Sequence, residues 1–288
     1  MKRNAAMAAR RMALGAAAAV FVGLAGAAGA ALVTETFDTD PAARGWVGIN
    51  NTSGGNSFAF VSSDGLGNNV GADTTSGEVG GLMVRSPTEA SYGVSISGSL
   101  SLAQSFTASG SFDITNQHSA NNGYGMVVGY YSSNPNDPSF AGFLIAEPSG
   151  TVGPRLFSWI RFTDGTNRLS SAMDAGPLDL IDETFAFTYD PTGNGSLAVS
   201  WTGVTSSGTG SGSLTASLAA GDKNKAITLD AFGLLSTVSF AQAGNDISLF
   251  IDNVTYFSLI PEPSMVSLVG LGGLLLWRRR LPAPRRNP

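Results

Sequence analysis

The stretch TFAFTYDPTGNGSLAVSWT, at residues 184–202, decides the fold class of this chain. Its two ends, 184–189 and 196–202, alternate apolar and polar side chains, and a period of two is typical of a half-buried β-strand. Between them lies DPTGNG, in which proline sets a bend and glycine and asparagine tolerate positive φ. The stretch therefore predicts a β-hairpin.

The same pattern extends over most of the chain, with short alternating segments, turn residues such as Asp164-Gly165, and almost no helical periodicity. There is no fixed-period repeat, so we expect one all-β sandwich domain over 32–259, with Thr205–Thr215 as a flexible loop. The further strands that we expect are Val33–Phe37, Ser57–Ser62, Gly80–Arg85, Tyr92–Ser97, Leu100–Phe106, Ser111–Thr115, Tyr124–Tyr131, Phe140–Ala146, Arg155–Phe162, Ile227–Leu234 and Ile247–Phe257.

Charge and composition exclude several functions. Residues 32–260 hold 7 of the 16 cations and 20 of the 21 carboxylates, so their net charge is 7 − 20 = −13. Without a cationic track, nucleic-acid binding is excluded. The chain has no Cys and a single His, His118, which excludes disulfides, thiolate catalysis and a His-rich zinc or iron site. A metal here would have to be a hard ion held by oxygens.

The first 31 residues have the three parts of a secretory signal peptide: four cations, an apolar stretch from Met12, and the small residues Ala28-Gly29-Ala30. We expect an N-terminal signal-peptide helix that is cleaved after Ala30, with Ala27 as the alternative cleavage position. A permanent membrane-anchoring helix is the competing interpretation, because the uncharged stretch is just long enough to span a bilayer.

At the other end, the apolar run Met265–Trp277 would form a short helix of about 20 Å, against a hydrocarbon core of about 30 Å. It is too short for a comfortable permanent span. The cations Arg278, Arg279 and Arg280 follow directly. They would stay on the cytoplasmic side and act as a stop for the chain during export. Pro261 and Pro263 keep the preceding segment extended and therefore open to cleavage.

Together, Ile260-Pro261-Glu262-Pro263-Ser264, the apolar run and the arginine cluster resemble the PEP-CTERM sorting signal over residues 260–280. The resemblance implies that an integral-membrane exosortase recognises and removes the tail, with only transient membrane contact, in a Gram-negative bacterium that makes exopolysaccharide. It implies export to the outer envelope, the cell surface or the extracellular matrix. Residues 281–288, a basic tail, extend beyond the usual end of such signals, and a simple C-terminal anchor is the alternative.

Four motifs in the body resemble the concanavalin A-like jelly rolls, which include laminin-G-like domains and carbohydrate-binding modules. The resemblance implies a jelly-roll β-sandwich and one candidate cofactor, calcium, which would tie the first and last strands through Glu35, Asp252 and Asp38. The alternative is that Asp252 caps a strand end and that Glu35 is simply exposed. The motifs are Thr36-Phe37-Asp38-Thr39-Asp40 with Gly45-Trp46, Ser76-Gly77-Glu78-Val79-Gly80-Gly81, Asp230-Ala231-Phe232-Gly233-Leu234 and Ile251-Asp252-Asn253-Val254-Thr255-Tyr256.

No catalytic residue is predicted. A hydrolase of this fold class needs two facing carboxylates, and the nearest set, Asp179, Asp182 and Glu183, is expected in a solvated turn before the strand 184–189. Sugar binding needs an exposed aromatic platform beside polar partners. The candidates are Tyr124, Tyr130 and Tyr131 with Asn121, Asn122 and Asn134, and also Trp46 and Trp159, most of which we expect in the core.

The leading hypothesis is therefore a non-enzymatic, exported cell-surface or matrix protein that binds polysaccharide. A polysaccharide-acting enzyme is the second hypothesis. An adhesive or ice-binding surface is the third, but it needs a regular array of threonines, and Thr34, Thr36 and Thr39 are too few.

Overall fold

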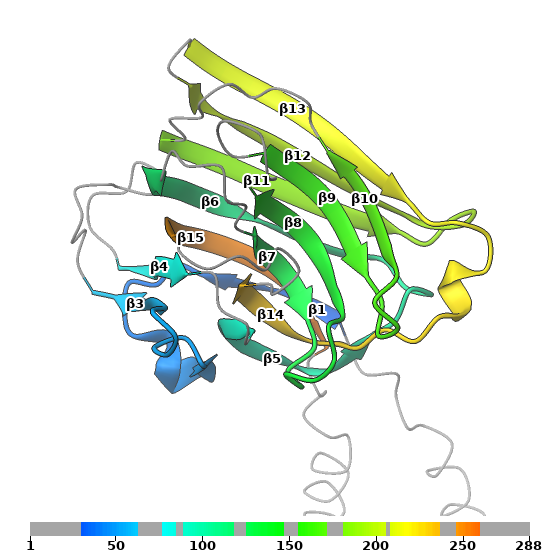
Figure 1. The fold of residues 1–288 in the computed structure, drawn as a ribbon, viewed down its shortest axis with the longest axis horizontal. Helices are drawn as coiled ribbons and strands as arrows, with labels where there is room; N and C mark the ends of the chain where they lie inside the picture. Colours follow the sequence, from blue (N-terminus) through cyan, green and yellow to red (C-terminus); the bar gives the residue numbers. More distant parts are fainter. Residues whose placement is uncertain are drawn as a thin grey trace, which may run out of the picture. The chain divides into compact units, whose positions relative to one another are not determined.

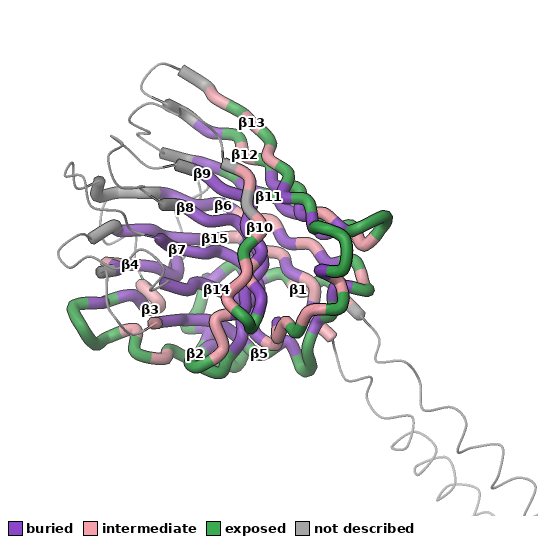
Figure 2. Tube along the Cα trace, turned by 45° about the vertical axis from the view of Figure 1, so that its right-hand side comes forward, coloured by how far each residue is buried: buried purple, intermediate pink, exposed green. Residues whose placement is uncertain are grey.

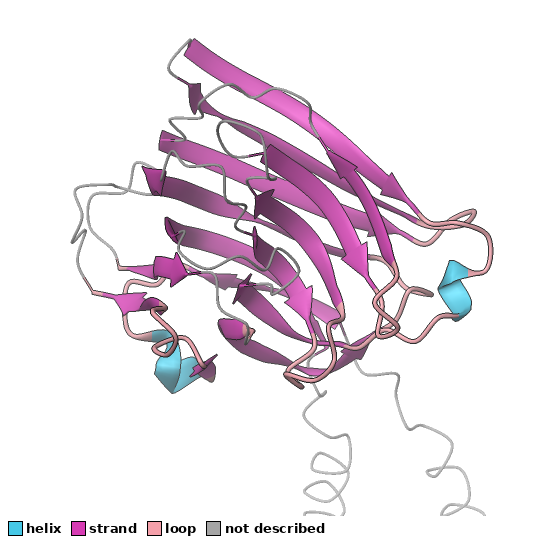
Figure 3. Ribbon diagram, in the orientation of Figure 1, coloured by secondary structure: helices cyan, strands magenta, loops and turns pink. Residues whose placement is uncertain are grey.

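The chain folds into two antiparallel β-sheets that pack face to face (Figures 1 and 3). The computed structural model describes residues 30–62, 77–84, 89–117, 125–146, 155–171, 181–205, 208–236 and 246–259. Residues Ala31–Leu259 form a compact unit. The predicted jelly-roll β-sandwich is confirmed, whereas the two predicted terminal helices lie outside the described residues. Within the described part, no helix is long and apolar enough to cross a bilayer.

One sheet has eight strands. Its order is β13 (Gly208–Ser217), β12 (Ser196–Thr205), β11 (Ile181–Asp190), β6 (Phe106–Gln117), β15 (Asp246–Leu259), β4 (Glu78–Val84) and β3 (Ser57–Val61), and β1 (Ala30–Glu35) also pairs with β15.

The other sheet has seven strands. Its order is β10 (Asn167–Ser171), β9 (Arg155–Arg161), β8 (Phe140–Ala146), β7 (Gly125–Tyr131), β14 (Leu229–Ser236), β5 (Ala90–Leu100) and β2 (Trp46–Ile49). The chain passes repeatedly from one sheet to the other, for example between β4, β5 and β6, so each sheet combines strands that are distant in sequence. Two short 3₁₀ helices, η1 (Pro41–Arg44) and η3 (Asp222–Asn224), lie in the connections.

The core lies between the sheets and follows the alternation seen in the sequence (Figure 2). On β11, Phe185, Phe187 and Tyr189 are buried, whereas the residues between them are exposed. Their register partners on β12 include Val199 and Leu197, which are also buried, so the hairpin predicted at 184–202 is confirmed. Aromatic rings dominate this core, and Phe106 stacks on Tyr189 with 4.9 Å between ring centroids.

Glycines let two central strands of the seven-stranded sheet approach closely. Gly129 on β7 and Gly142 on β8 are register partners. A Cβ atom on Gly142 would lie 2.5 Å from the carbonyl oxygen of Val128, and a Cβ on Gly129 would lie 2.5 Å from that of Ala141. No side chain larger than hydrogen fits at either position without moving backbone.

Several strand predictions were wrong. Residues 205–215, predicted as a loop, belong mostly to β13, which pairs with β12 over its whole length. The inward positions of β13 include Gly210 and Gly212, so the apolar half of the alternation is missing from the sequence. The predicted strand Leu100–Phe106 is mainly the connection between β5 and β6. The short strands β2 and β10 were not predicted at all.

Candidate functional site

A depression of about 380 Å³ lies on the face of the eight-stranded sheet that is turned away from the core. It forms where β15, β6, β11 and β12 lie side by side. Its polar lining comprises Ser109, Ser111, Thr184, Ser200, Thr202 and Asn253. Because these residues come from four strands, only the strand register brings them together.

The floor of the depression is set by that register. Ser111, Thr184 and Thr202 occupy one row across β6, β11 and β12, and the row beside it holds Ser109 and Ser200 with Ala186 between them. The hydroxyl oxygens of Thr184 and Thr202 lie 2.6 Å apart. Each hydroxyl offers one donor and two acceptor positions, so the floor presents uncharged hydrogen-bonding groups.

The same chemistry continues over the neighbouring strands. Of the exposed outward positions of β11, β12 and β13, all except Asp190, at the end of β11, carry Thr, Ser or Ala, and we call nine of them the hydroxyl face. They are Thr184, Ala186, Thr188, Ala198, Ser200, Thr202, Ser211, Ser213 and Thr215. None of these side chains is charged, although the body of the protein is strongly acidic.

Asn253 enters the depression through an irregularity in β15. The register between β15 and β6 shifts between Asp252 and Thr255, and Asn253 has a φ of 50°. The buried carboxylate of Asp252 accepts hydrogen bonds from the backbone N–H of Asn253 (2.7 Å) and from its Nδ2 (2.8 Å). Because this fixes the Nδ2 end of the amide, Asp252 orients Asn253 at the rim of the site.

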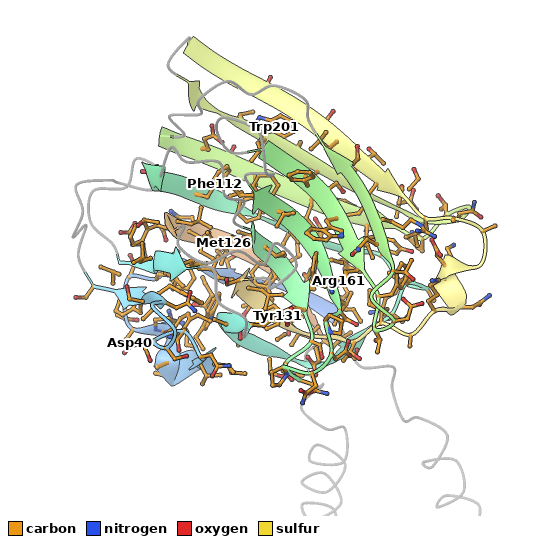
Figure 4. All side chains as sticks on the ribbon, viewed as in Figure 1. Asp40, Phe112, Met126, Tyr131, Arg161 and Trp201 are labelled. Atoms are coloured by element: carbon orange, nitrogen blue, oxygen red, sulfur yellow. The ribbon has the colours of Figure 1, made fainter. Side chains whose placement is uncertain are left out.

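Trp201, labelled in Figure 4, is one of the residues around the depression, but it occupies an inward position of β12, as Leu197 and Val199 do. It is half-buried and packs against the edge of the core. Its ring lies over Gly212 of β13, since a Cβ atom there would be 2.1 Å from Cζ2 of the indole. The indole of Trp201 therefore lies on the core side of the sheet, opposite the hydroxyls of the depression, and Trp46 and Trp159 are buried.

Two carboxyl groups are buried next to these strands. Glu183 on β11 is 1% exposed and Asp113 on β6 is 0% exposed. Burial, and secondly the negative charge of Asp113, raises the pKa of Glu183 to about 8. The prediction of a solvated turn at Glu183 was wrong, because β11 begins at Ile181. Glu183 is two residues before Phe185 and four before Phe187, so it faces the same side of the strand, and this spacing could have revealed its burial.

The predicted sugar-binding aromatics belong to the core. Tyr130, Tyr131, Trp46 and Trp159 are all at most 3% exposed, which confirms the core interpretation for these four. Tyr130 donates a hydrogen bond from its hydroxyl to the carbonyl of Thr107 (2.8 Å), and the Trp159 Nε1 donates to Asn167 (3.0 Å). Asn134 is exposed, whereas Tyr124, Asn121 and Asn122 lie outside the described residues.

The predicted calcium ligands are not brought together. Among the described residues, no group of three or more His, Asp or Glu side chains is arranged to hold a metal ion. Glu35 is buried, not exposed, and its Oε2 pairs with the Nε of Arg44 at 2.6 Å. Asp38 is exposed and accepts a hydrogen bond from the hydroxyl of Thr36 (2.6 Å). The structure thus gives no positive evidence for calcium.

The predicted processing sites fall largely outside the described residues. Ala28 precedes the first described residue, and Ala30, the predicted cleavage position, opens β1. The sorting residues Pro261, Glu262, Pro263, Arg278, Arg279 and Arg280 follow the last described residue, and His118 falls in a gap between described segments.

No protein-family model and no curated protein matches the sequence. Among solved structures, the galactose complex of the lectin UEA-II has a TM-score of 0.44 and 11% identity, over 80% of this chain and 97% of the lectin. A protein of unknown function from Shewanella oneidensis MR-1 has a TM-score of 0.41 and 14% identity, over 80% and 86%. The alginate lyase Aly36B has a TM-score of 0.39 and 9% identity, over 78% and 96%. The chain is similar to these proteins in fold alone.

Proposed function

We propose that the protein is an exported, non-enzymatic cell-surface or matrix protein that binds neutral polysaccharide in the depression on its eight-stranded sheet. The observation that carries the proposal is the lining of this depression. It combines uncharged hydroxyls with the amide of Asn253. Sugar hydroxyls need such donors and acceptors.

Charge favours a neutral ligand over an anionic one. The body has a net charge of −13, from 7 cations and 20 carboxylates, and would repel a polyanion such as alginate. The described lining of the depression contains no charged side chain that could offset this repulsion. A neutral glucan or galactan meets no such penalty.

A binding role is also supported by the position of the buried carboxyl groups. A general acid must reach the glycosidic oxygen of its substrate, directly or through one water. Glu183 and Asp113 are at most 1% exposed, and neither lines the depression. This arrangement favours binding over hydrolysis.

Retention on immobilised polysaccharides tests the proposal. The full chain should be retained on at least one immobilised neutral polymer and should not be retained on immobilised alginate. Thr184→Arg places a large cation in the depression and should abolish retention. Thr188→Arg is the matched control, because Thr188 is also an exposed outward threonine of β11 whose hydroxyl meets a threonine on the next strand, but it does not line the depression. Absence of retention on every polymer, or equal loss in both variants, would refute the site.

For export, the proposal rests on the two terminal signals in the sequence. Mass spectrometry of the protein recovered from its native host should show a mature N-terminus near Ala30 and a C-terminus near Pro261-Glu262-Pro263. Deletion of Arg278–Arg280 should leave the tail uncleaved. A mature protein that retains its arginines would rule out exosortase processing.

A further inference from the structure

The strand β13 ends the eight-stranded sheet with an unusually open edge (Figure 1). It is 10 residues long, and all of them pair with β12 without a bulge. Antiparallel pairing on one side uses the backbone groups of every second residue, so the others direct their N–H and C=O groups away from β12. Among the described strands, none pairs with β13 on that side.

The other sheet edges are protected by their length, and β13 is the exception. Within the described residues, the other edge strands, β1, β2, β3 and β10, have 6, 4, 5 and 5 residues. Short edge strands, charges, prolines and bulges are the usual means by which proteins prevent edge-to-edge association. The sequence of β13, GTGSGSLTAS, contains no charge and no proline. An edge of this kind is a template for another strand.

Apolar groups near the edge support a partner. Leu214 of β13 is only half-buried, and so is Trp201, whose ring passes over Gly212 toward the edge. A strand added beside β13 would cover both side chains.

We propose that β13 pairs with β13 of a second copy of this chain, in antiparallel orientation, to form a two-fold symmetric dimer with one continuous sheet. A second copy fits because the edge is self-complementary. Its exposed Ser211, Ser213 and Thr215 can meet their own counterparts without charge repulsion, and opposite Ser and Thr pairs favour antiparallel pairing. The two-fold axis runs perpendicular to the sheet, so an isologous interface results and the assembly closes at two chains.

Such a dimer would place both hydroxyl faces on the same side of the joined sheet. If the proposed polysaccharide binding holds, one polymer chain could then contact both depressions, and this consequence rests on that function. The dimer itself does not, because it depends only on β13. Linked sites raise the apparent affinity for a long polymer without any new contact.

Cysteine variants test the dimer cleanly, because the native chain contains no cysteine. Cysteine is placed in the full chain singly at Ser211, Ser213, Thr215 and Ser217, for a two-fold axis that passes an outward residue, and at adjacent pairs of these positions, for an axis that passes the inward residue between them. Paired Cα atoms would then be about 5 Å apart, within the range of a disulfide. Ser200→Cys is the matched control, since Ser200 is the exposed register partner of Ser213 on β12. Its two copies would be about 14 Å apart, three strand spacings, and too far for a bond.

Under mild oxidation, the best β13 variant should give at least about tenfold more covalent dimer than Ser200→Cys. A Ser213→Lys/Thr215→Lys variant should shift the sedimentation coefficient from dimer to monomer while its circular dichroism spectrum stays unchanged. Equal cross-linking on β12 and β13 would reveal random association and overturn the proposal, as would a monomer at every concentration. Polysaccharide retention is measured separately, so a wild-type chain that is monomeric and still retained refutes this inference and leaves the proposed function standing.

Discussion

Glu183 gives the folded protein a stability that depends on pH. Its pKa is 4.5 ordinarily and about 8 in the folded protein, where burial is the main cause and Asp113 the second. Because the folded-state pKa is raised, the contribution of Glu183 is fully present below pH 4.5 and is lost progressively as pH rises to 8. The difference corresponds to about 5 kcal/mol of unfolding free energy, or about 1.4 kcal/mol per pH unit within this window.

Substitution of Glu183 by Gln removes the ionisation and keeps the size of the side chain. The unfolding free energies of wild type and Glu183→Gln are measured in urea at pH 5, 7 and 9, where other titrating groups cancel in the difference. Between pH 5 and pH 9, wild type should lose about 4 kcal/mol of unfolding free energy relative to Glu183→Gln. Asp113→Asn should lower the folded-state pKa of Glu183 and so reduce the pH dependence of stability, but not abolish it, because Glu183 stays buried. A wild-type to Glu183→Gln difference that is constant from pH 5 to 9 would refute this reasoning.

Three further substitutions test the packing, each by urea unfolding. Tyr130→Phe should cost about 1 to 3 kcal/mol, because the backbone N–H of Phe257 loses the buried hydroxyl that accepts it at 2.7 Å. Gly142→Ala should cost about 1 to 3 kcal/mol or prevent folding, and a neutral result would contradict the close approach of β7 and β8. Asp222→Asn should cost about 1 to 3 kcal/mol, since the buried carboxylate accepts from Arg168 Nε (2.6 Å) and Nη2 (3.1 Å); insensitivity would mean that this pair contributes nothing.

The sequence alone predicted the strands whose inward side chains are large. The hairpin at 184–202 was correct because Phe185, Phe187 and Val199 mark its buried side at every second position. The strand β13 was missed because glycine occupies inward positions that Trp201 covers from the neighbouring strand. Local alternation cannot reveal a buried face whose apolar atoms come from another strand.

The candidate site could not be predicted for a related reason. Ser109, Thr184, Thr202 and Asn253 are separated by up to 144 residues, and Ser and Thr are common throughout the body. Their meeting depends on the order of β15, β6, β11 and β12 and on a register that is set by packing of the opposite face. Aromatic residues are the sugar-binding signal that is visible in the sequence, but the structure places Tyr130, for example, in the core.

The distribution of charge connects the site with the edge. Exposed charged residues of the described part, such as Asp38, Asp40, Asp164 and Asp190, lie in turns or at strand ends, whereas the hydroxyl face has none. At physiological ionic strength, screening acts over about 8 Å, so the acidic body repels anionic polymers at its periphery while the hydroxyl face meets a neutral surface directly. The same separation lets two β13 edges approach each other despite the high net charge. Thr184→Arg and Ser213→Lys each add one charge to the hydroxyl face at a different place. The first should therefore weaken sugar binding and the second dimerisation, so the two properties can be tested separately within one sheet.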